Sequence, residues 1–295
     1  MKKDPVIFLL IVVVIMCIAT AAKILAMHLS HEKNDPESEY FVTTGDDIID
    51  DTVAISEFDE LDLDVSSINT YIQTGDSFKL EYHAFEYNIP EVEQNGKSLT
   101  VKQPSHTGIF NLHIKNEEQY YRITVPKSAG MLDVDLDASS GKINIEGISL
   151  EGKANLSSGN FILNNSEGDD FDLRISSGNA NLENVKFESL KLDLSSGNLN
   201  VQGCTSNELE AKMSSGNMNL SGMGFKEGDF KSSSGNLKLE VVGNKDDFSY
   251  DLKASTGSVV LDGERIDKKY RSEVEKDRSI KADITSGKIE ISFTK

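Results

Sequence analysis

The sequence has 295 residues, which is long enough to bury a full hydrophobic core. Its formal net charge of −19 argues against binding to nucleic acid and against docking on an anionic lipid surface, since both carry negative charge. The two cysteines, Cys17 in an apolar segment and Cys204 in a predicted loop, cannot plausibly meet, and this excludes a disulfide framework.

The N-terminal segment, residues 1–27, is predicted to be a transmembrane signal-anchor helix. Lys2 and Lys3 precede an unbroken apolar run over residues 6–22, which residues 24–27 extend. About 22 apolar residues are enough to cross a bilayer. The basic start places the N-terminus in the cytoplasm and the remainder of the chain outside the membrane.

There are two alternatives to an uncleaved anchor. Residues 19–21, Ala-Thr-Ala, suit a signal peptidase, and cleavage there would give a secreted protein. The apolar run is long for a signal peptide, so the anchor is preferred. A lipoprotein signal centred on Cys17 is disfavoured, because Met16 is bulky where such signals carry a small residue.

Residues 28–52 are predicted to form a flexible acidic linker, because this segment has no sustained apolar periodicity. Its acids are Glu32, Asp35, Glu37, Glu39, Asp46, Asp47, Asp50 and Asp51. Paired acids can hold calcium, but these lack the alternating ligand spacing of a calcium loop. A solvated linker is therefore the preferred interpretation.

Residues 53–130 are predicted to be an irregular N-terminal β region that supplies the first coils and a cap. Apolar residues alternate in four short segments, residues 61–65, 78–82, 99–101 and 121–125. Asn95-Gly96 is typical of a tight hairpin. A cap is expected because an uncovered end of a stack is an edge that invites aggregation.

A glycine recurs with a near-constant period through residues 131–295. The spacings are 18, 19, 19, 19, 19, 22 and 30 residues, and the glycines are Gly141, Gly159, Gly178, Gly197, Gly216, Gly235, Gly257 and Gly287. A fixed period near 20 indicates a solenoid, in which each repeat buries its apolar face only against its neighbours. We therefore predict an all-β fold, a parallel β-solenoid of stacked coils of about 19 residues.

The repeat around Gly197 shows why each coil must bend. Leu192 and Leu194 alternate with polar residues before this glycine, and Leu199 and Val201 do so after it. Leu194 and Leu199 are five residues apart, so a straight strand would point them to opposite faces. A bend at the intervening Ser-Ser-Gly-Asn brings both inward, because glycine tolerates positive φ and Ser and Asn satisfy local backbone groups.

Stacking of the coils aligns outward asparagines into rows. The candidate interaction face consists of Asn179, Asn181, Asn198, Asn200, Asn217 and Asn219. Such rows present spaced donors and acceptors to a polysaccharide, a cell-wall polymer or a protein strand. The other interpretation, which is preferred, is that the asparagines support the bends and keep the outer face hydrated.

Two features depart from the repeat. The copy around Gly235 is the weakest, because it places Gly228 and Ser232 at inward positions. Residues 263–279 interrupt the rhythm with a mixed-charge segment, predicted to be a surface loop between the last two coils. Residues 280–293 are then predicted to form the final coil.

The Ser-Ser-Gly-Asn repeats resemble a bacterial adhesin-like family of β-strand-repeat domains of unknown function. Residues 61–67, Leu-Asp-Leu-Asp-Val-Ser-Ser, and residues 123–126, Ile-Thr-Val-Pro, are similar to the opening segments of that family. The resemblance covers roughly residues 56–295. It implies surface adhesion, and some members resemble membrane-anchored accessory proteins of Gram-positive envelope-stress loci. It carries over no catalytic residue.

No catalytic, metal or cofactor site is predicted. A serine nucleophile needs a base within hydrogen-bond reach, and the solenoid contains no histidine. The acids are scattered through turns and loops, which disfavours a glycan-acting enzyme. All five histidines precede the repeats, and none has a second metal-ligating residue at a suitable spacing. They are His28, His31, His83, His106 and His113.

The sequence therefore predicts a non-catalytic, membrane-anchored extracytoplasmic protein that is an accessory, adhesion or interaction module of the bacterial cell envelope. Its expected partners are membrane lipid through the N-terminal helix and either an envelope protein or a cell-wall polymer. The alternative is a cell-wall polysaccharide-binding module, with a glycan-acting enzyme less favoured. Cys204 is expected to be a small, half-buried core residue.

Overall fold

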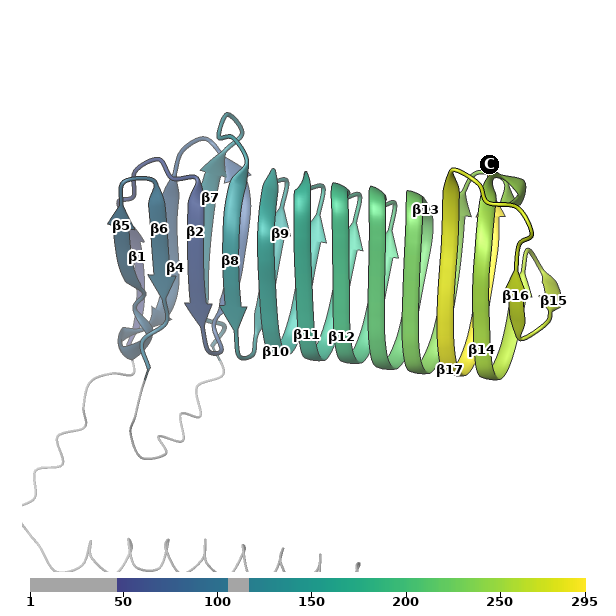
Figure 1. The fold of residues 1–295 in the computed structure, drawn as a ribbon. Coiled ribbons are helices and arrows are strands. Elements are labelled where there is room, and N and C mark those ends of the chain that lie inside the picture. Colours follow the sequence, from purple (N-terminus) through teal and green to yellow (C-terminus); the bar gives the residue numbers. More distant parts are fainter. Residues whose placement is uncertain (1–46, 106–116) are drawn as a thin grey trace, which may run out of the picture. The chain divides into compact units, whose positions relative to one another are not determined.

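The computed structural model describes residues 47–105 and 117–295, and the predicted membrane anchor lies outside them. The described residues form β-strands and two short 3-10 helices, η1 (Glu86–Asn88) and η2 (Lys245–Asp247). Their strands belong to one sheet that winds around a single core (Figure 1). The prediction of an all-β, solenoid-like fold is confirmed. Within these described residues, no helix has the length and apolar character to cross a bilayer.

The central coils show the repeat in its plainest form. Each long strand runs along one side of the core, bends at a corner glycine and returns along the other side (Figure 1). Consecutive coils pair in parallel, with Gly178 opposite Gly197 and Asn179 opposite Asn198. The strands of this region are β8 (Leu132–Ala138), β9 (Lys142–Glu146), β10 (Leu150–Asn164), β11 (Glu167–Glu183), β12 (Lys186–Gln202) and β13 (Thr205–Val242), the last of which contains two corners.

The corner at Gly197 bends as the odd spacing of its leucines requires. Leu194 and Leu199 are both fully buried although five residues separate them. Gly197 has φ of 127°, a conformation that side chains with a Cβ rarely adopt. The corners also stack closely, since a Cβ on Gly197 would lie 1.6 Å from the carbonyl oxygen of Gly178. Backbone conformation and close approach therefore both require glycine here.

At the N-terminal end, the spatial order of the coils differs from the order in the sequence. The first coil consists of β2 (Glu60–Val65) and β3 (Asn69–Gly75), which pair in parallel with β8 and β9. β6 (Ser98–Lys102) and β7 (Tyr120–Pro126) come later in the chain but pair with the opposite edges of β2 and β3. The first coil is therefore enclosed on both sides.

Antiparallel strands cover this end of the stack. β5 (Glu91–Asn95) forms a hairpin with β6 around the predicted Asn95-Gly96 turn, and β4 (Lys79–Phe85) pairs with β7. β1 (Ile48–Val53) pairs with β4 along all six of its residues. The predicted linker extended to residue 52, so its end is corrected: Ile49 and Val53 pack against the core, which the acidic composition of the segment concealed.

The C-terminal end also departs from the predicted order of coils. β17 (Arg278–Thr294) pairs in parallel with the second half of β13 on one edge and with β14 (Phe248–Leu261) on the other. The last coil in the sequence therefore lies between its two predecessors, and the prediction that residues 280–293 form the final coil is wrong. The 30-residue interval before Gly287 gives the chain enough length to pass the outermost coil and return.

The segment that makes this return is more ordered than a surface loop. It contains β15 (Glu264–Ile266) and β16 (Lys269–Arg271), which both pair antiparallel with β14 (Figure 1). These two strands are short and rich in charged residues. Short charged strands on an outer edge discourage pairing with another chain, so this end of the stack is protected.

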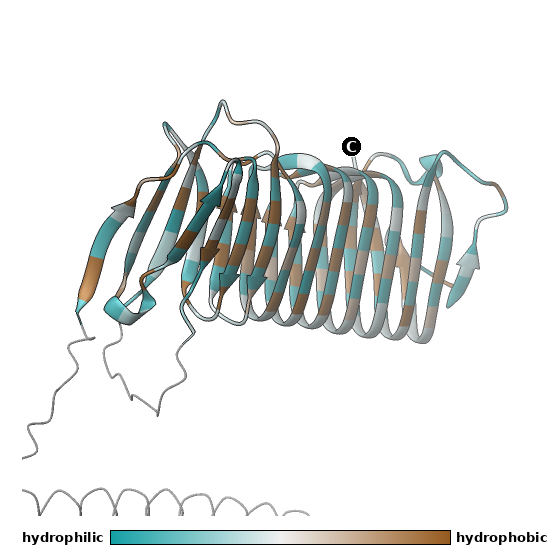
Figure 2. Ribbon diagram, turned by 60° about the vertical axis from the view of Figure 1, so that its left-hand side comes forward, coloured by the Kyte–Doolittle hydropathy of each residue, from teal (hydrophilic) through white to brown (hydrophobic). Residues whose placement is uncertain are grey.

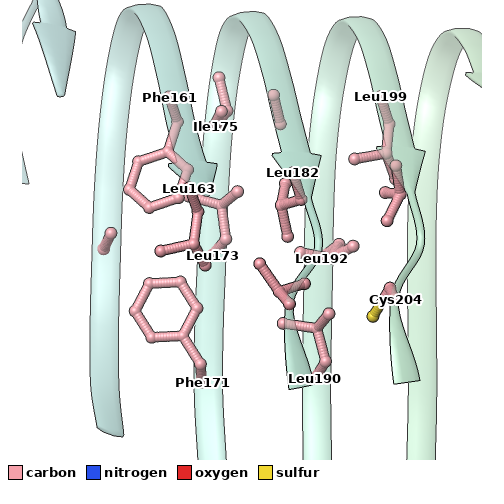
Figure 3. Close-up of a cluster of buried hydrophobic side chains, with 14 of the residues drawn as sticks. Phe161, Leu163, Phe171, Leu173, Ile175, Leu182, Leu190, Leu192, Leu199 and Cys204 are labelled. Atoms are coloured by element: carbon pink, nitrogen blue, oxygen red, sulfur yellow. The ribbon is translucent and has the colours of Figure 1, made fainter. Parts of the chain in front are cut away.

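The core consists of apolar columns that follow the stacking direction. Apolar and polar residues alternate along each strand (Figure 2). Leu173 and Leu192 lie opposite each other on successive coils, and both point into the stack (Figure 3). The rings of Phe161, Phe171 and Phe187 stack with centroid separations of 5.9 and 5.8 Å. Cys204 is fully buried rather than half-buried as predicted, because it points into the core (Figure 3) and lies one coil after Val185 in the same column.

Aromatic rings fill the core of the repeat around Gly235, the repeat with the weakest apolar pattern. A Cβ on Gly228 would lie 2.7 Å from ring carbons of both Phe225 and Phe230, so these rings occupy the space that a larger side chain would need. Ser232 remains at its inward position. Its side chain is buried, and its hydroxyl has no hydrogen-bond partner among the described residues.

Replacement of Ser232 by alanine is therefore expected to raise the free energy of unfolding by about 1 kcal/mol, because it removes a buried hydroxyl without a partner. Urea denaturation checks this. The matched control is Ser166→Ala, because the buried Ser166 hydroxyl donates to the Asn164 carbonyl at 2.9 Å and accepts from Ile148 N–H at 3.3 Å. This second change should cost about 1 kcal/mol. Equal effects of the two changes would contradict the interpretation.

Candidate interaction faces

Rows of asparagine follow the outward side of the second half of each coil. In the row next to the corners, each side-chain amide donates to the amide oxygen one coil earlier, at 3.1 Å for Asn179 to Asn160, 3.0 Å for Asn198 to Asn179, 3.5 Å for Asn217 to Asn198 and 3.0 Å for Asn236 to Asn217. In the next row, the distances are 3.0 Å for Asn200 to Asn181 and 3.1 Å for Asn219 to Asn200. We call this side of the stack the amide face. It brings together the six asparagines predicted as a candidate interaction face.

The prediction omits Asn160 and Asn236, which continue the row next to the corners. The signal that finds them is the asparagine directly after each corner glycine. Within these asparagine rows, each amide with two neighbours donates one N–H to one of them and accepts a hydrogen bond from the other. One N–H and one lone pair of its oxygen therefore remain for solvent or a ligand. The asparagine rows therefore link neighbouring coils and keep part of their hydrogen-bonding capacity for a ligand.

The outward side of the first half of each coil is charged instead. In its central row, acids and bases alternate from coil to coil through Asp135, Lys153, Asp172, Lys191 and Glu210. Lys153 Nζ lies 3.0 Å from Asp135, and Lys191 Nζ lies 3.9 Å from Asp172. These pairs are exposed and screened by solvent, so they add little to the stability of the stack. We call this side the charged face.

The alternation of charge fails where β2 lies beside β8. Three carboxylates on each strand face one another directly, and the pairs are Glu60 with Asp133, Asp62 with Asp135, and Asp64 with Asp137. Like charges opposite each other on neighbouring strands are destabilising. Open grooves of about 650 and 530 Å³ lie over this part of the charged face. This acidic surface was not predicted from the sequence, although the Leu-Asp-Leu-Asp pattern of residues 61–64 places its aspartates on one side of a strand.

Tyrosines and cations gather at the N-terminal end of the amide face. Tyr71 on β3 lies opposite Arg122 on β7, and Tyr120 lies on the same side of β7. The guanidinium carbon of Arg122 is 4.6 Å from the ring centre of Tyr120 and 5.8 Å from that of Tyr71. Lys142 Nζ on β9 is 4.6 Å from the ring centre of Tyr71. We call these four residues the tyrosine–cation cluster.

The cluster extends the asparagine rows rather than standing apart from them. Lys142 lies opposite Asn160, and Tyr71 lies opposite Asn144 on β9. Sequence reasoning missed the cluster because its members are far apart in the chain and only the pairing of β3, β7 and β9 brings them together. The available signal was Tyr120, which precedes the buried Tyr121 and must therefore face outward.

His83 lies beside the cluster and is half-buried. Its Nδ1 is 2.6 Å from a carboxylate oxygen of Asp50, and its ring stacks on Tyr120 with centres 5.5 Å apart. No sequence pattern indicates this acid partner, because Asp50 precedes His83 by 33 residues. Across residues 47–105 and 117–295, no group of three or more metal-ligating side chains comes together. The other four histidines, His28, His31, His106 and His113, lie outside the described residues.

Burial of Cys204 predicts that its thiol reacts slowly in the native protein. Desolvation raises the pKa of its thiol to about 12, so at neutral pH the thiolate that reacts with disulfide reagents is scarce. In full-length protein with Cys17→Ser, we expect the thiol to react with an aromatic disulfide reagent only in denaturant. Absorbance of the released thiol measures this. Rapid reaction of the native protein would contradict the burial of Cys204.

The chain is similar to a known protein family and to solved structures. A family model described as Toastrack DUF4097 matches residues 58–292. A solved candidate adhesin from Parabacteroides merdae ATCC 43184 is 14% identical with a TM-score of 0.50, and the match covers 85% of this chain and 97% of that chain. A solved candidate lipid-binding protein from Parabacteroides distasonis ATCC 8503 is 16% identical with a TM-score of 0.47, covering 85% and 98%. No curated protein sequence matches significantly. Since the family model spans most of its length, the chain belongs to the Toastrack DUF4097 family.

Proposed function

We propose that the chain is a non-catalytic adhesion or interaction module, accessory to the bacterial cell envelope. The observation that carries this proposal is the regularity of the stack. Its outward faces repeat similar side chains from coil to coil in one register, which is how solenoid proteins present extended binding surfaces. The adhesin description of the Parabacteroides merdae protein, which shares the fold, supports it.

We propose further that residues 1–27 anchor the chain in the cytoplasmic membrane, with the N-terminus inside and the stack outside. The apolar run behind Lys2 and Lys3 supports this arrangement. Protease added to intact cells should degrade a C-terminally tagged chain, while a cytoplasmic marker remains whole. Protection of the tag until the membrane is broken would contradict the exported position. Release of the tagged chain into the medium would favour the cleaved form.

Site-specific photocrosslinking in cells tests the interaction role. A photoreactive residue at Asn200 samples the amide face, and one at Lys191 samples the charged face. We expect one of these positions to yield a discrete crosslinked envelope protein that the other does not yield. Parallel binding to purified wall polymer tests the alternative of a polysaccharide-binding module. Failure of both assays would contradict an interaction role and leave the stack as a spacer.

The non-catalytic part of the proposal has its own test. A broad panel of glycans and esters should show no turnover above that of buffer. Turnover that is lost when acids of the β2 and β8 surface are changed to amides would overturn this part, because carboxylate pairs can hydrolyse glycans.

A further inference from the structure

The tyrosine–cation cluster carries positive charge on a strongly acidic molecule. The whole chain has a net charge of −19. Among the described residues, neither Arg122 nor Lys142 has a carboxylate oxygen within ion-pair distance, and both side chains contact tyrosine rings. The cluster is therefore a local exception to the charge balance of the surface around it.

Three acids near the cluster each contact a group other than its two cations. Glu81 lies opposite Arg122 across β4 and β7, but its carboxylate is 2.7 Å from Lys79 Nζ. Glu118 accepts hydrogen bonds at 3.1 Å from the Tyr71 hydroxyl and at 3.1 Å from the Asn69 amide. Asp50 contacts His83. None of these three carboxylates lies within ion-pair distance of Arg122 or Lys142, so both cations can pair with an outside anion, while Glu118 helps to hold the ring of Tyr71 in place.

The rings offer a second kind of contact next to these charges. Tyr71 and Tyr120 are partly exposed, and their ring centres are 6.0 Å apart with the planes nearly perpendicular. The ring faces already contact the two cations, and Tyr120 also stacks on His83, so the exposed ring edges and hydroxyls remain for contact with a sugar unit. Beyond the rings, the asparagine row begins at Asn160 and can donate to hydroxyl groups of further sugar units.

We propose that the tyrosine–cation cluster binds an anionic glycan. A sugar ring packs against Tyr71 and Tyr120, and a uronate carboxylate or a phosphate of the same polymer pairs with Arg122 and Lys142. Arginine suits either anion, because its planar guanidinium donates two parallel hydrogen bonds. This inference rests on the proposed interaction role and names the ligand class and the place where it binds.

Each half of the cluster excludes a simpler ligand. A neutral glycan would use the rings and amides but would leave two cations without partners. An acidic peptide would pair with the cations but would not bring sugar hydroxyl groups to the tyrosines and the asparagine row. A ligand with a sugar ring and an anion in one unit uses all four side chains.

Binding of defined polymers to the full-length chain in detergent tests the proposal. Polygalacturonate supplies uronate and phosphomannan supplies phosphate, whereas dextran is neutral and poly-glutamate carries charge without sugar. We expect at least one of the two anionic glycans to bind about tenfold or more tightly than dextran and poly-glutamate, as a site that uses rings and charges together predicts. Whichever anionic glycan binds identifies the anion. Equal binding of dextran or poly-glutamate, or binding of neither anionic glycan, would overturn the proposal.

Variants locate the site on the molecule. Tyr71→Ala and Arg122→Gln should each weaken binding of the anionic glycan by about tenfold or more. Tyr71→Phe keeps the ring and should retain most of the binding. The matched controls are Tyr270→Ala, an exposed tyrosine at the opposite end, and Arg174→Gln, an exposed arginine on the charged face. Both should bind as the parent does. Equal losses in the controls would overturn the assignment.

Circular dichroism melting establishes that each variant is folded before its affinity is compared. If Tyr71→Ala does not fold, Arg122→Gln still decides the matter, because it preserves most of the packing. The result is also separable from the proposed function. If the chain binds no anionic glycan but still gives a face-specific protein crosslink, only this inference is refuted. If both results are negative, the proposed interaction role is refuted as well.

Discussion

Replacement of Gly197 by alanine is expected to lower the free energy of unfolding by about 3–5 kcal/mol, which is a large effect for a single substitution. The new Cβ would lie 1.6 Å from the Gly178 carbonyl oxygen, and the residue would have to keep φ of 127°. Either the backbone strains or the corner moves away from its neighbour. Movement would break the parallel pairing on both sides, because Gly197 is also stacked against Gly216. Urea denaturation of the full-length chain measures the loss.

A second glycine separates conformation from close approach. Gly263 also has positive φ, 82°, but a Cβ there would meet nothing within 4 Å. Gly263→Ala should therefore cost only about 1 kcal/mol, which is the conformational part alone. Similar losses for the two variants would show that the corners are not tightly stacked. That result would undermine the account of why each corner contains glycine.

The repeat geometry is the part of the structure that the sequence predicts well. The 19-residue interval between corner glycines becomes the register of β11 on β12 and of β12 on β13. The odd separation of Leu194 and Leu199 required a bend, and both side chains are buried. These features are local, because each depends on alternation within one coil and on the distance to the next. A period therefore carries enough information to place them.

The order of the coils at the two ends is not encoded in that period. β6 and β7 lie outside β2 and β3, and β17 lies between β13 and β14. A repeat with the right inward residues fits against any other coil, so its pattern does not say which neighbour it takes. The unequal interval before Gly287 was the available hint, since it provides more chain than a direct step requires.

The same limitation applies to the candidate binding surfaces. The asparagine rows were predicted because their spacing equals the repeat. The tyrosine–cation cluster was not, because Tyr71, Arg122 and Lys142 become neighbours only through the unusual placement of β7 beside β3. Irregular ends of a regular stack are thus where side chains of different kinds can be combined. We regard this as the reason that the most distinctive surface lies outside the repeats.

The inserted position of β17 leads to an all-or-none prediction about crosslinking. Outward residues Lys238 on β13 and Val260 on β14 both lie opposite Glu290 on β17, one on each side. In a Cys17→Ser background, the cysteine pair Lys238→Cys with Glu290→Cys should form a disulfide on oxidation. So should Val260→Cys with Glu290→Cys, because residues opposite each other on adjacent strands are about 5 Å apart. Mass spectrometry of the oxidised protein detects each product.

The informative pair is Lys238→Cys with Val260→Cys. β17 separates these positions by two strand spacings, about 9–10 Å, which exceeds the reach of a disulfide. Coils stacked in the order of the sequence would instead place residues 238 and 260 on adjacent strands, and the pair would then crosslink readily. Cys204 serves as an internal control, since its buried thiol should join no product. A crosslink between residues 238 and 260, with none to residue 290, would restore the sequential order and refute the inserted strand.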